Sequence, residues 1–341
     1  MVEVTAQVPP TAPDVYFTGE YGRLDAQTVG GRWSMLADNE GAWQMPVVIS
    51  EIEHGACEAA SPYGYSGIYL WPDLSEADAK TAWEASTSFL EKAGVVSLFL
   101  RFSPLDPRSS QVANALPGLT IVRSGITYLV NVTDVESMWT AMEGRARTAI
   151  RKARQQGMTG RVRRLEPKDL ESGAPFRELY EGTMRRVGAA ERYYFDDAYF
   201  ARFAQMTDAD VFLAEVADGQ NVVASALVMR HAENAHYHLS GSNPEAARKG
   251  ANAILIWSIL EWCAESGVKL CHLGGGLTEQ DGLAKFKRSF GGEAADFYTG
   301  RAVIDKAAYS RLTRARADEL GTTVVALEET GFFPAFRAGA V

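Results

Sequence analysis

Residues 236–292 constrain the fold of this chain more than any other stretch, because short apolar runs, a long apolar segment and several glycines follow one another there. We expect a strand at His236–Leu239, a loop of small residues at Ser240–Gly250, a helix at Ala251–Ser266 and a second strand at Val268–Leu273. A helix that begins just after a glycine-rich turn presents free N–H groups and a positive dipole end to an anion, most often a phosphate. The stretch therefore indicates an α/β protein with a site for an anionic group, such as the phosphate of a group-donating substrate.

An earlier part of the chain repeats this order of elements. A capped helix that runs through Lys92 precedes an apolar strand at Val95–Phe102. Each half also contains a hairpin before its helix, at residues 32–51 in the first half and at residues 211–230 in the second. Two similar halves predict two similar domains.

Five short motifs lie in or near the constraining stretch. They are Ser240-Gly241-Ser242, Leu255-Ile256-Trp257-Ser258-Ile259, Gly274-Gly275-Gly276, Phe286-Lys287 and Phe290-Gly291-Gly292. Together they resemble the Fem-like branch of the GNAT acyltransferases, over most of residues 135–305. The resemblance implies an α/β fold of two tandem GNAT-like domains, each a mixed, mostly antiparallel sheet flanked by helices, with a cleft between them. We expect an acceptor-side domain at residues 1–134 and a donor-side, catalytic domain at residues 135–341.

Fem-like enzymes join an amine to an activated acyl group. The resemblance implies transfer from aminoacyl-tRNA to an amine of a small nucleotide-bearing or peptidyl acceptor, such as a cell-wall precursor or an intermediate of a peptidyl-nucleoside antibiotic. An aminoacyl ester is already activated, so the site must only hold the amine, accept a proton and stabilise the oxyanion. No nucleophile elbow, Walker sequence, dinucleotide fingerprint or paired-His zinc motif suggests other chemistry. We expect no cofactor and no metal.

Phe286 and Lys287 match the Phe-Lys pair of the Fem-like pattern. The resemblance implies that Lys287 stabilises the tetrahedral intermediate and that Phe286 orients the acyl adenosine end. The other interpretation is a surface lysine in a cluster with Lys285 and Arg288. The sequence does not select the proton acceptor among its candidates, which are His236, His238, His272, Glu279 and Asp281.

The residues before the helix at 251–266 bear on the donor. CoA-dependent GNAT enzymes usually carry Gln/Arg-x-x-Gly-x-Gly/Ala, whose N–H groups surround a pyrophosphate. With Gly250 as the first glycine, the flanking positions hold Ala247 and Asn252, so the pattern fails at both ends. Arg248, Lys249 and Gly250 remain candidates for holding donor phosphate. An acyl-CoA-dependent N-acyltransferase on an amino sugar or similar metabolite is the alternative hypothesis.

Eight cations stand close together in a chain whose formal net charge is −9. They are Arg145, Arg147, Arg151, Lys152, Arg154, Arg161, Arg163 and Arg164. A charge run is normally a solvated helix face, but Glu143 is the one acid nearby, which also allows contact with a polyanion. We predict that Arg147, Arg151, Lys152 and Arg154 contact the donor RNA. A non-catalytic RNA-binding protein on the same fold is a third hypothesis.

Two features in the first half are candidates for the acceptor site. Ser61–Gly67 contains the turn-forming residues of a loop, and its Tyr63 and Tyr65 offer stacking and hydrogen-bonding groups. Arg101 ends the strand of the first half, where a cation holds a phosphate or a carboxylate well. The alternatives are a packed loop and an ordinary surface ion pair.

Composition excludes several other classes of protein. The isoelectric point near 5.2 argues against nonspecific coating of nucleic acid, and we expect no DNA partner. The three cysteines form no CxxC pair and have no histidine at zinc-finger spacing, which argues against a disulfide framework or a structural metal. No apolar run approaches the roughly 20 residues that span a bilayer, and the N-terminus lacks a signal pattern, so we expect a cytoplasmic protein.

Overall fold

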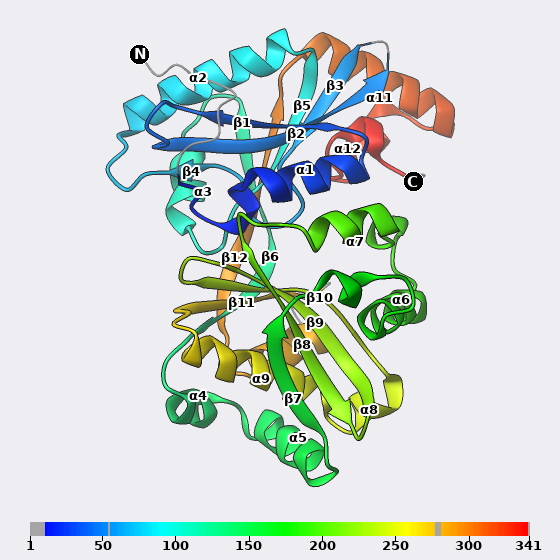
Figure 1. The fold of residues 1–341 in the computed structure, drawn as a ribbon. Helices are drawn as coiled ribbons and strands as arrows, with labels where there is room; N and C mark the ends of the chain where they lie inside the picture. The colour runs from blue at the N-terminus through cyan, green and yellow to red at the C-terminus, as the bar shows by residue number, and fades with distance from the viewer. Residues whose placement is uncertain (1–10, 54, 277–280, 340–341) are drawn as a thin grey trace. The chain divides into compact units, whose positions relative to one another are not determined.

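The computed structural model describes residues 11–53, 55–276 and 281–339 (Figure 1). The chain divides into two compact units. The first unit comprises Met1–Ser124 together with Phe297–Val341, and the second unit comprises Gly125–Asp296.

These units differ from the predicted ranges of 1–134 and 135–341. The boundary falls near residue 124, and the last segment of the chain belongs with the first unit. The reason is strand β12 (Glu293–Val303), which pairs antiparallel with β5 (Val95–Arg101) of the first unit, from Thr299 opposite Arg101 to Val303 opposite Ser97. This long-range pairing carries the C-terminal helices back to the first unit, and no local sequence signal marks it.

The first unit contains a mixed sheet with the strand order β1-β2-β3-β5-β12. The pairs are antiparallel except for β3 and β5, which run in parallel. Its other elements, beside β5 and β12, are η1 (Val15–Phe17), α1 (Gly19–Thr28), β1 (Arg32–Ala37), β2 (Trp43–Glu53), β3 (Ala56–Ala60), β4 (Tyr69–Leu70), α2 (Glu76–Lys92), α3 (Pro107–Ala113), α11 (Lys306–Leu320), α12 (Val324–Glu329) and η4 (Ala335–Arg337).

The second unit contains a sheet with the order β6-β11-β10-β9-β8-β7, in which only β10 and β11 run in parallel. Its strands are β6 (Leu119–Asn131), β7 (Thr159–Arg164), β8 (Asp210–Asp218), β9 (Asn221–His231), β10 (Asn234–Ser242) and β11 (Leu270–Gly275). Its helices are α4 (Val135–Ala141), α5 (Gly144–Gln155), η2 (Pro167–Leu170), α6 (Pro175–Val187), η3 (Glu191–Tyr193), α7 (Asp197–Phe203), α8 (Pro244–Arg248), α9 (Ala251–Glu265) and α10 (Gly282–Arg288).

The internal repeat predicted from the sequence is present in these units. Each has a hairpin (β1–β2 or β8–β9), a third antiparallel strand (β3 or β10), a helix (α2 or α9) and a strand that pairs in parallel with the third one (β5 or β11). The α/β class, with mixed and mostly antiparallel sheets flanked by helices, is therefore confirmed. Two such units fit the predicted tandem arrangement.

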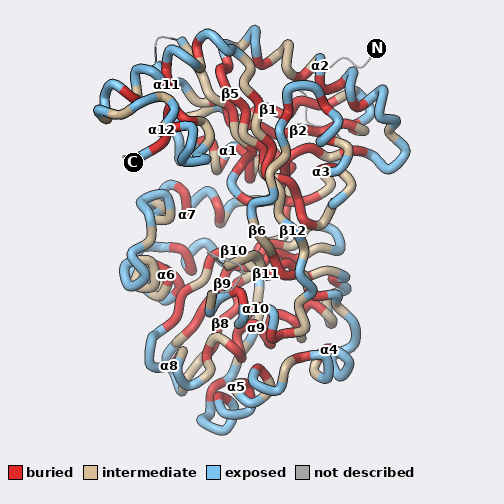
Figure 2. Tube along the Cα trace, turned by 180° about the vertical axis from the view of Figure 1, so that it is seen from behind, coloured by how far each residue is buried: buried red, intermediate tan, exposed pale blue. Residues whose placement is uncertain are grey.

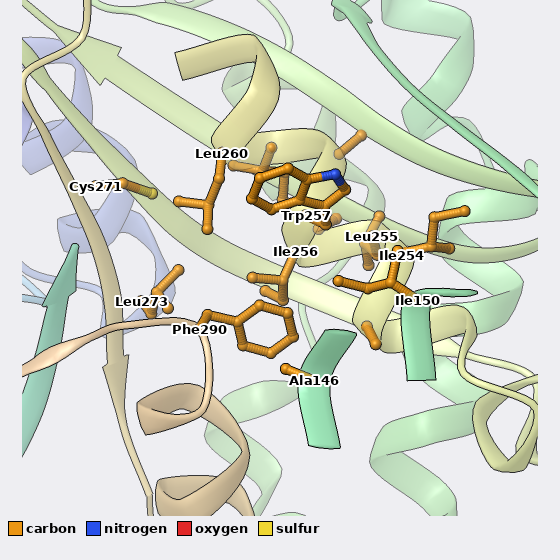
Figure 3. Packing of buried hydrophobic residues seen from close by; sticks show 14 of the residues in the cluster. Ala146, Ile150, Ile254, Leu255, Ile256, Trp257, Leu260, Cys271, Leu273 and Phe290 are labelled. Atoms are coloured by element: carbon orange, nitrogen blue, oxygen red, sulfur yellow. The ribbon is translucent and has the colours of Figure 1, made fainter. Parts of the chain in front are cut away.

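Helix α9 forms the centre of the second unit. Ten of its fifteen residues are buried, as expected for a helix that is apolar on all sides. One side packs on β7, β8 and β9, and another packs on α4 and α5. Figure 3 shows Trp257 and Ile254 of α9 together with Ile150 of α5. The predicted helix at Ala251–Ser266 is confirmed to within one residue.

The predicted loop at Ser240–Gly250 is wrong in most of its length. Strand β10 continues to Ser242, and α8 follows at Pro244–Arg248. Asn243 caps α8, because its Oδ1 accepts hydrogen bonds from the N–H groups of Glu245 and Ala246 at 2.9 and 3.1 Å. The small residues of this segment, which suggested a loop, are thus equally compatible with a capped short helix.

Candidate active site

The parallel strands β10 and β11 pair only over their first residues. Asn234 lies opposite Leu270, and the register continues to His236 opposite His272. Just beyond, β10 shifts register against β9 between Tyr237 and Ser240, and β11 shifts against β6 between His272 and Gly274. Such irregularities bend strands and are common beside active sites. The two strands, as described, therefore separate after the histidine pair, and we call this place the divergence point.

The side chain of Lys287 contacts both strands at the divergence point. It lies on α10, whose first turn is capped by Asp281, and its Nζ donates a hydrogen bond of 2.7 Å to the carbonyl oxygen of Gly275 in β11. The same Nζ lies 5.9 Å from the ring centroid of Tyr237 in β10. Lys287 is only 7% exposed. The alternative of a surface lysine is therefore wrong for Lys287, although Lys285 and Arg288 are exposed.

Burial determines the electrostatics of Lys287. Loss of hydration lowers the pKa of its ammonium to about 8, although the charge of Asp281 acts in the opposite direction. The group therefore keeps its positive charge at neutral pH. Within the described part of the chain, Gly275 provides the one hydrogen-bond acceptor of Nζ, so two of its three N–H groups can donate to an oxyanion. A poorly hydrated cation stabilises a developing negative charge more than a hydrated one does.

The pH dependence of turnover should follow Lys287. The ammonium is present below its pKa of about 8 and is lost above it, so we expect kcat to decline as the pH rises through that value. In Lys287→Arg the guanidinium stays protonated over the whole range, and the decline should vanish from the residual activity. Steady-state rates of both proteins from acid to alkaline pH provide the measurement. The same descending limb in Lys287→Arg would assign it to another group.

Phe286 lies on the other side of α10 and is half-buried. Its ring meets that of Phe290 edge to face, with centroids 5.0 Å apart and planes inclined by 76°. Both rings belong to the main core cluster or pack against it. Phe286 thus anchors α10, and its role in orienting the acyl end of the donor stays a prediction.

The candidate proton acceptors have different surroundings. The Nδ1 atoms of His236 and His272 are 3.3 Å apart, and both side chains are buried. Burial, then the charges of His236 and Lys287, hold the pKa of His272 well below its usual value. Burial likewise lowers the pKa of His238 to about 3, and this ring stacks on Phe203 at 5.6 Å. Asp281 serves as the α10 cap, and Glu279 lies outside the described residues.

The start of α9 packs closely against α5. Gly250 has a φ of +103°, and a Cβ at this position would lie 2.5 Å from the carbonyl oxygen of Ala149 in α5. Ala251 is fully buried, whereas Arg248 and Lys249 are exposed at the end of α8. The glycine is thus required by the close approach of α5. Arg248 and Lys249 lie exposed just before this glycine, and their role with Gly250 in holding donor phosphate stays a prediction.

The expectation that the basic stretch has almost no acidic partners is wrong. Five of its arginines form ion pairs, most of them with acids distant in the sequence. The pairs are Arg145–Glu143, Arg154–Glu261, Arg161–Glu215, Arg163–Glu215 with Arg163–Asp169, and Arg164–Asp210, with N–O distances of 2.5–3.1 Å. Much of the apparent charge excess is therefore neutralised within the fold.

Of the four residues predicted to contact RNA, Arg147 caps the end of a helix. Its guanidinium donates to the carbonyl oxygens of Trp139, Thr140 and Met142, which lie at the end of α4. Arg154 is held by Glu261. Arg151 and Lys152 lie exposed on α5, and the Arg151 guanidinium lies 5.3 Å from the ring centroid of Trp139.

Arg147→Ala should mainly affect stability. Removal of the guanidinium leaves the last carbonyl groups of α4 without their donor, and we expect the free energy of unfolding to fall by about 1–2 kcal/mol. Lys152→Ala, on the exposed side of α5, should change it by less than about 0.5 kcal/mol. Urea denaturation followed by circular dichroism measures both. Equal stability of the two variants would remove the capping role from Arg147.

The acceptor-site candidates lie together in the first unit. The backbone of Tyr63 is held by α1, since its carbonyl accepts from the Tyr21 hydroxyl at 2.7 Å and its N–H donates to Asp25 at 3.0 Å. Tyr65 packs edge to face on Phe297 at 5.2 Å. Arg101 Nη1 donates to the carbonyl oxygen of Ser61 at 3.0 Å. These contacts shape the loop from the inside, and a role for the three residues in acceptor binding stays a prediction.

Tyr237 and the carbonyl of Gly275 were not identified from the sequence. Gly275 belongs to the Gly-Gly-Gly motif, but nothing in the sequence gives its carbonyl or Tyr237 a role, and the parallel pairing of β10 with β11 places both beside Lys287. Among the described residues, no group of three or more His, Cys, Asp or Glu side chains is arranged to hold a metal ion. In the same part of the chain, every helix is too short or too polar to cross a bilayer.

Comparisons with known proteins show similarities in sequence and in fold. Residues 142–288, which include Lys287, match the family of the acetyltransferase (GNAT) domain. The crystal structure of FemX has a TM-score of 0.68, covers 89% of this chain and 95% of FemX, and is 13% identical in sequence. A search of the curated proteins gave no match.

Two further solved structures have the same fold. The C-terminal domain of a putative lysylphosphatidylglycerol synthetase from Agrobacterium fabrum has a TM-score of 0.53 and 17% identity, covering 84% of this chain and 90% of that domain. A conserved protein of unknown function from Bacteroides thetaiotaomicron has a TM-score of 0.59 and 10% identity, covering 89% and 100%. The chain thus shares its fold with FemX, and residues 142–288 are similar to an acetyltransferase (GNAT) domain, as the motifs predicted. The match of these residues supports an acyltransferase of the GNAT superfamily.

Proposed function

We propose that this protein transfers an aminoacyl group from an aminoacyl-tRNA to an amine of a small nucleotide-bearing or peptidyl acceptor. The main support is the buried ammonium of Lys287, which lies where strands β10 and β11 separate. Its remaining N–H groups can donate hydrogen bonds to an oxyanion. An acceptor of this kind is a cell-wall precursor or a peptidyl-nucleoside antibiotic intermediate. The donor is a substrate, and no cofactor takes part.

The reaction forms one amide bond and breaks one ester bond. The lone pair of the amine nitrogen attacks the ester carbonyl carbon, and the carbonyl electrons move to its oxygen, where Lys287 donates hydrogen bonds. Collapse of this intermediate expels the ribose oxygen of the tRNA. In the overall balance the amine loses one proton and the ribose oxygen gains one. Lys287 acts as a positive donor in this scheme, so the site needs no covalent intermediate on the protein.

The acyl-CoA alternative has one observation in its favour, the match of residues 142–288 to an acetyltransferase domain family. Against it stands the close approach of α5 to Gly250, where a Cβ would lie 2.5 Å from the carbonyl oxygen of Ala149, beside the turn at which such enzymes hold a pyrophosphate. The failure of the CoA-binding pattern at Ala247 and Asn252 points in the same direction. We therefore favour the RNA donor.

A transfer assay tests the proposal even when the acceptor is unidentified. The protein is incubated with a protein-free metabolite extract and tRNA charged with radiolabelled amino acids, and the products are then treated with mild alkali. Aminoacyl esters are cleaved by this treatment and amides survive, so an alkali-stable labelled product is expected. A parallel reaction contains labelled acetyl-CoA. Stable label from acetyl-CoA alone would refute the RNA donor and support the alternative.

A further inference from the structure

The N-terminal part of α5 and the short helix α10 are joined by direct contacts. Arg145 Nη2 donates to the carbonyl oxygen of Lys285 at 2.7 Å, and the backbone N–H of Glu143 donates to the carbonyl oxygen of Ser289 at 2.9 Å. Side chains from two segments that are far apart in the sequence therefore share one surface. Figure 2 shows the outward side of α5 as exposed.

Five exposed cations lie on these two helices, and we call them the cationic ridge. They are Arg145, Arg151, Lys152, Lys285 and Arg288. In the described ranges, the ion pairs of these five side chains all involve Glu143, which lies 2.7 Å from Arg145 and 3.4 Å from Arg288. Five positive charges thus share one carboxylate. The ridge keeps a positive excess, unlike the arginines of β7, which are paired with acids.

Two of these positions conflict with local stability. Arg145 lies in the first turn of α5, where the helix dipole is positive, and no acidic residue occupies that turn. Arg288 is brought close to Arg145 because both contact Glu143. Glu143 offsets part of this repulsion, and the excess of positive charge that remains is a local conflict of the kind found at functional sites. An anion bound there would relieve both repulsions.

The ridge also has a fixed relation to the candidate active site. Lys285, Lys287 and Arg288 lie on the same short helix, with Lys287 buried at the divergence point and its two neighbours exposed. A polyanion on the ridge would therefore have one end near the Lys287 ammonium. An RNA donor needs this geometry, because its reactive ester is at the end of a charged backbone.

We propose that the cationic ridge binds the phosphate backbone of the duplex stem next to the aminoacylated end of the RNA donor. This inference rests on the proposed function and revises the set of RNA contacts predicted from the sequence. Arg145, Lys285 and Arg288 join Arg151 and Lys152, whereas Arg147 donates to carbonyl oxygens at the end of α4 and Arg154 is paired with Glu261. Binding of this kind reads shape and charge rather than base sequence.

Charge reversal at two positions of the ridge provides the test. The probe is a fluorescent RNA hairpin that copies a tRNA acceptor stem and carries an amide-linked amino acid at its 3′ end. Lys152→Glu with Lys285→Glu should weaken binding about tenfold or more near 0.1 M salt, and should lower the slope of log affinity against log salt by about 2. The control is Arg311→Glu with Arg314→Glu, an equal charge change on exposed residues of α11 in the first unit. It should weaken binding less than about twofold.

The possible outcomes separate the ridge from the donor assignment. If the unmodified protein binds the hairpin tightly, and both double variants change hairpin affinity and transfer equally, the ridge is not the binding surface. The RNA donor would then remain in place. No hairpin binding by the unmodified protein would overturn both. Vesicles rich in phosphatidylglycerol are tested in parallel. Loss of vesicle binding in the ridge variant, with unchanged hairpin affinity, would assign the surface to an anionic membrane and contradict the inference.

Discussion

Lys287→Ala is expected to lower turnover by about two to three orders of magnitude. Removal of one preorganised donor to an oxyanion typically costs about 3–4 kcal/mol of transition-state stabilisation, and here the donor is also charged and buried. The variant leaves the Gly275 carbonyl and the Tyr237 ring at the divergence point without the ammonium between them. Single-turnover rates with a saturating donor give the cleanest comparison, because they separate chemistry from product release.

Two control variants distinguish loss of catalysis from loss of folding. Lys287→Met keeps the length of the buried side chain and removes its charge. Burial depresses the pKa of Lys287 in the folded state, so its ionised form opposes folding at neutral pH, and the Met variant should be at least as stable as the unmodified protein. Lys306→Ala changes an exposed lysine on α11, outside the cationic ridge, and should preserve the single-turnover rate. A fall in the Lys287→Ala rate of less than about fivefold, with folding intact, would exclude Lys287 from the mechanism.

Trp257→Ala is expected to lower the free energy of unfolding by about 3–5 kcal/mol, the usual range for truncating a fully buried aromatic residue. Trp257 is 1% exposed at the centre of α9, and its ring meets that of Trp139 at 5.1 Å. Figure 3 shows it among the apolar side chains of α9. The substitution leaves a cavity in the main core of the second unit, and chemical denaturation measures the loss.

Trp257→Phe provides a sharper comparison at the same site. The buried indole Nε1 has no hydrogen-bond partner among the residues that the structure describes. Replacement by Phe removes this unsatisfied donor and keeps an aromatic ring, so we expect a cost below about 1.5 kcal/mol. A cost as large as that of Trp257→Ala would show that the indole N–H is satisfied in solution.

The elements that the sequence predicts well are those set by local patterns. Helix α9 is predictable because its apolar residues and the glycines beside it are contiguous, and the two hairpins are predictable from turn residues between apolar runs. The motif around Phe286 and Lys287 indicates the fold and the residue that lies at the divergence point. The burial of Lys287 could not be predicted, because neighbouring cations in the sequence suggest an exposed cluster.

The features that the sequence does not predict depend on contacts between distant segments. The acids that neutralise Arg154, Arg161 and Arg164 come from α9 and β8, and no spacing rule connects them. The return of β12 to β5 assigns the C-terminal helices to the first unit for the same reason. The cations that have no such partner can be recognised only once these ion pairs are known. Recognising them changes the set of residues that form the candidate RNA surface.

Equilibrium binding distinguishes an RNA donor from a CoA donor. The unmodified protein is titrated with the aminoacylated RNA hairpin at several salt concentrations, and its thermal unfolding is followed in parallel with CoA and acetyl-CoA. We expect saturable hairpin binding that weakens steadily with salt, and no rise in melting temperature with either CoA compound. A CoA-dependent rise in melting temperature without hairpin binding would contradict the RNA donor.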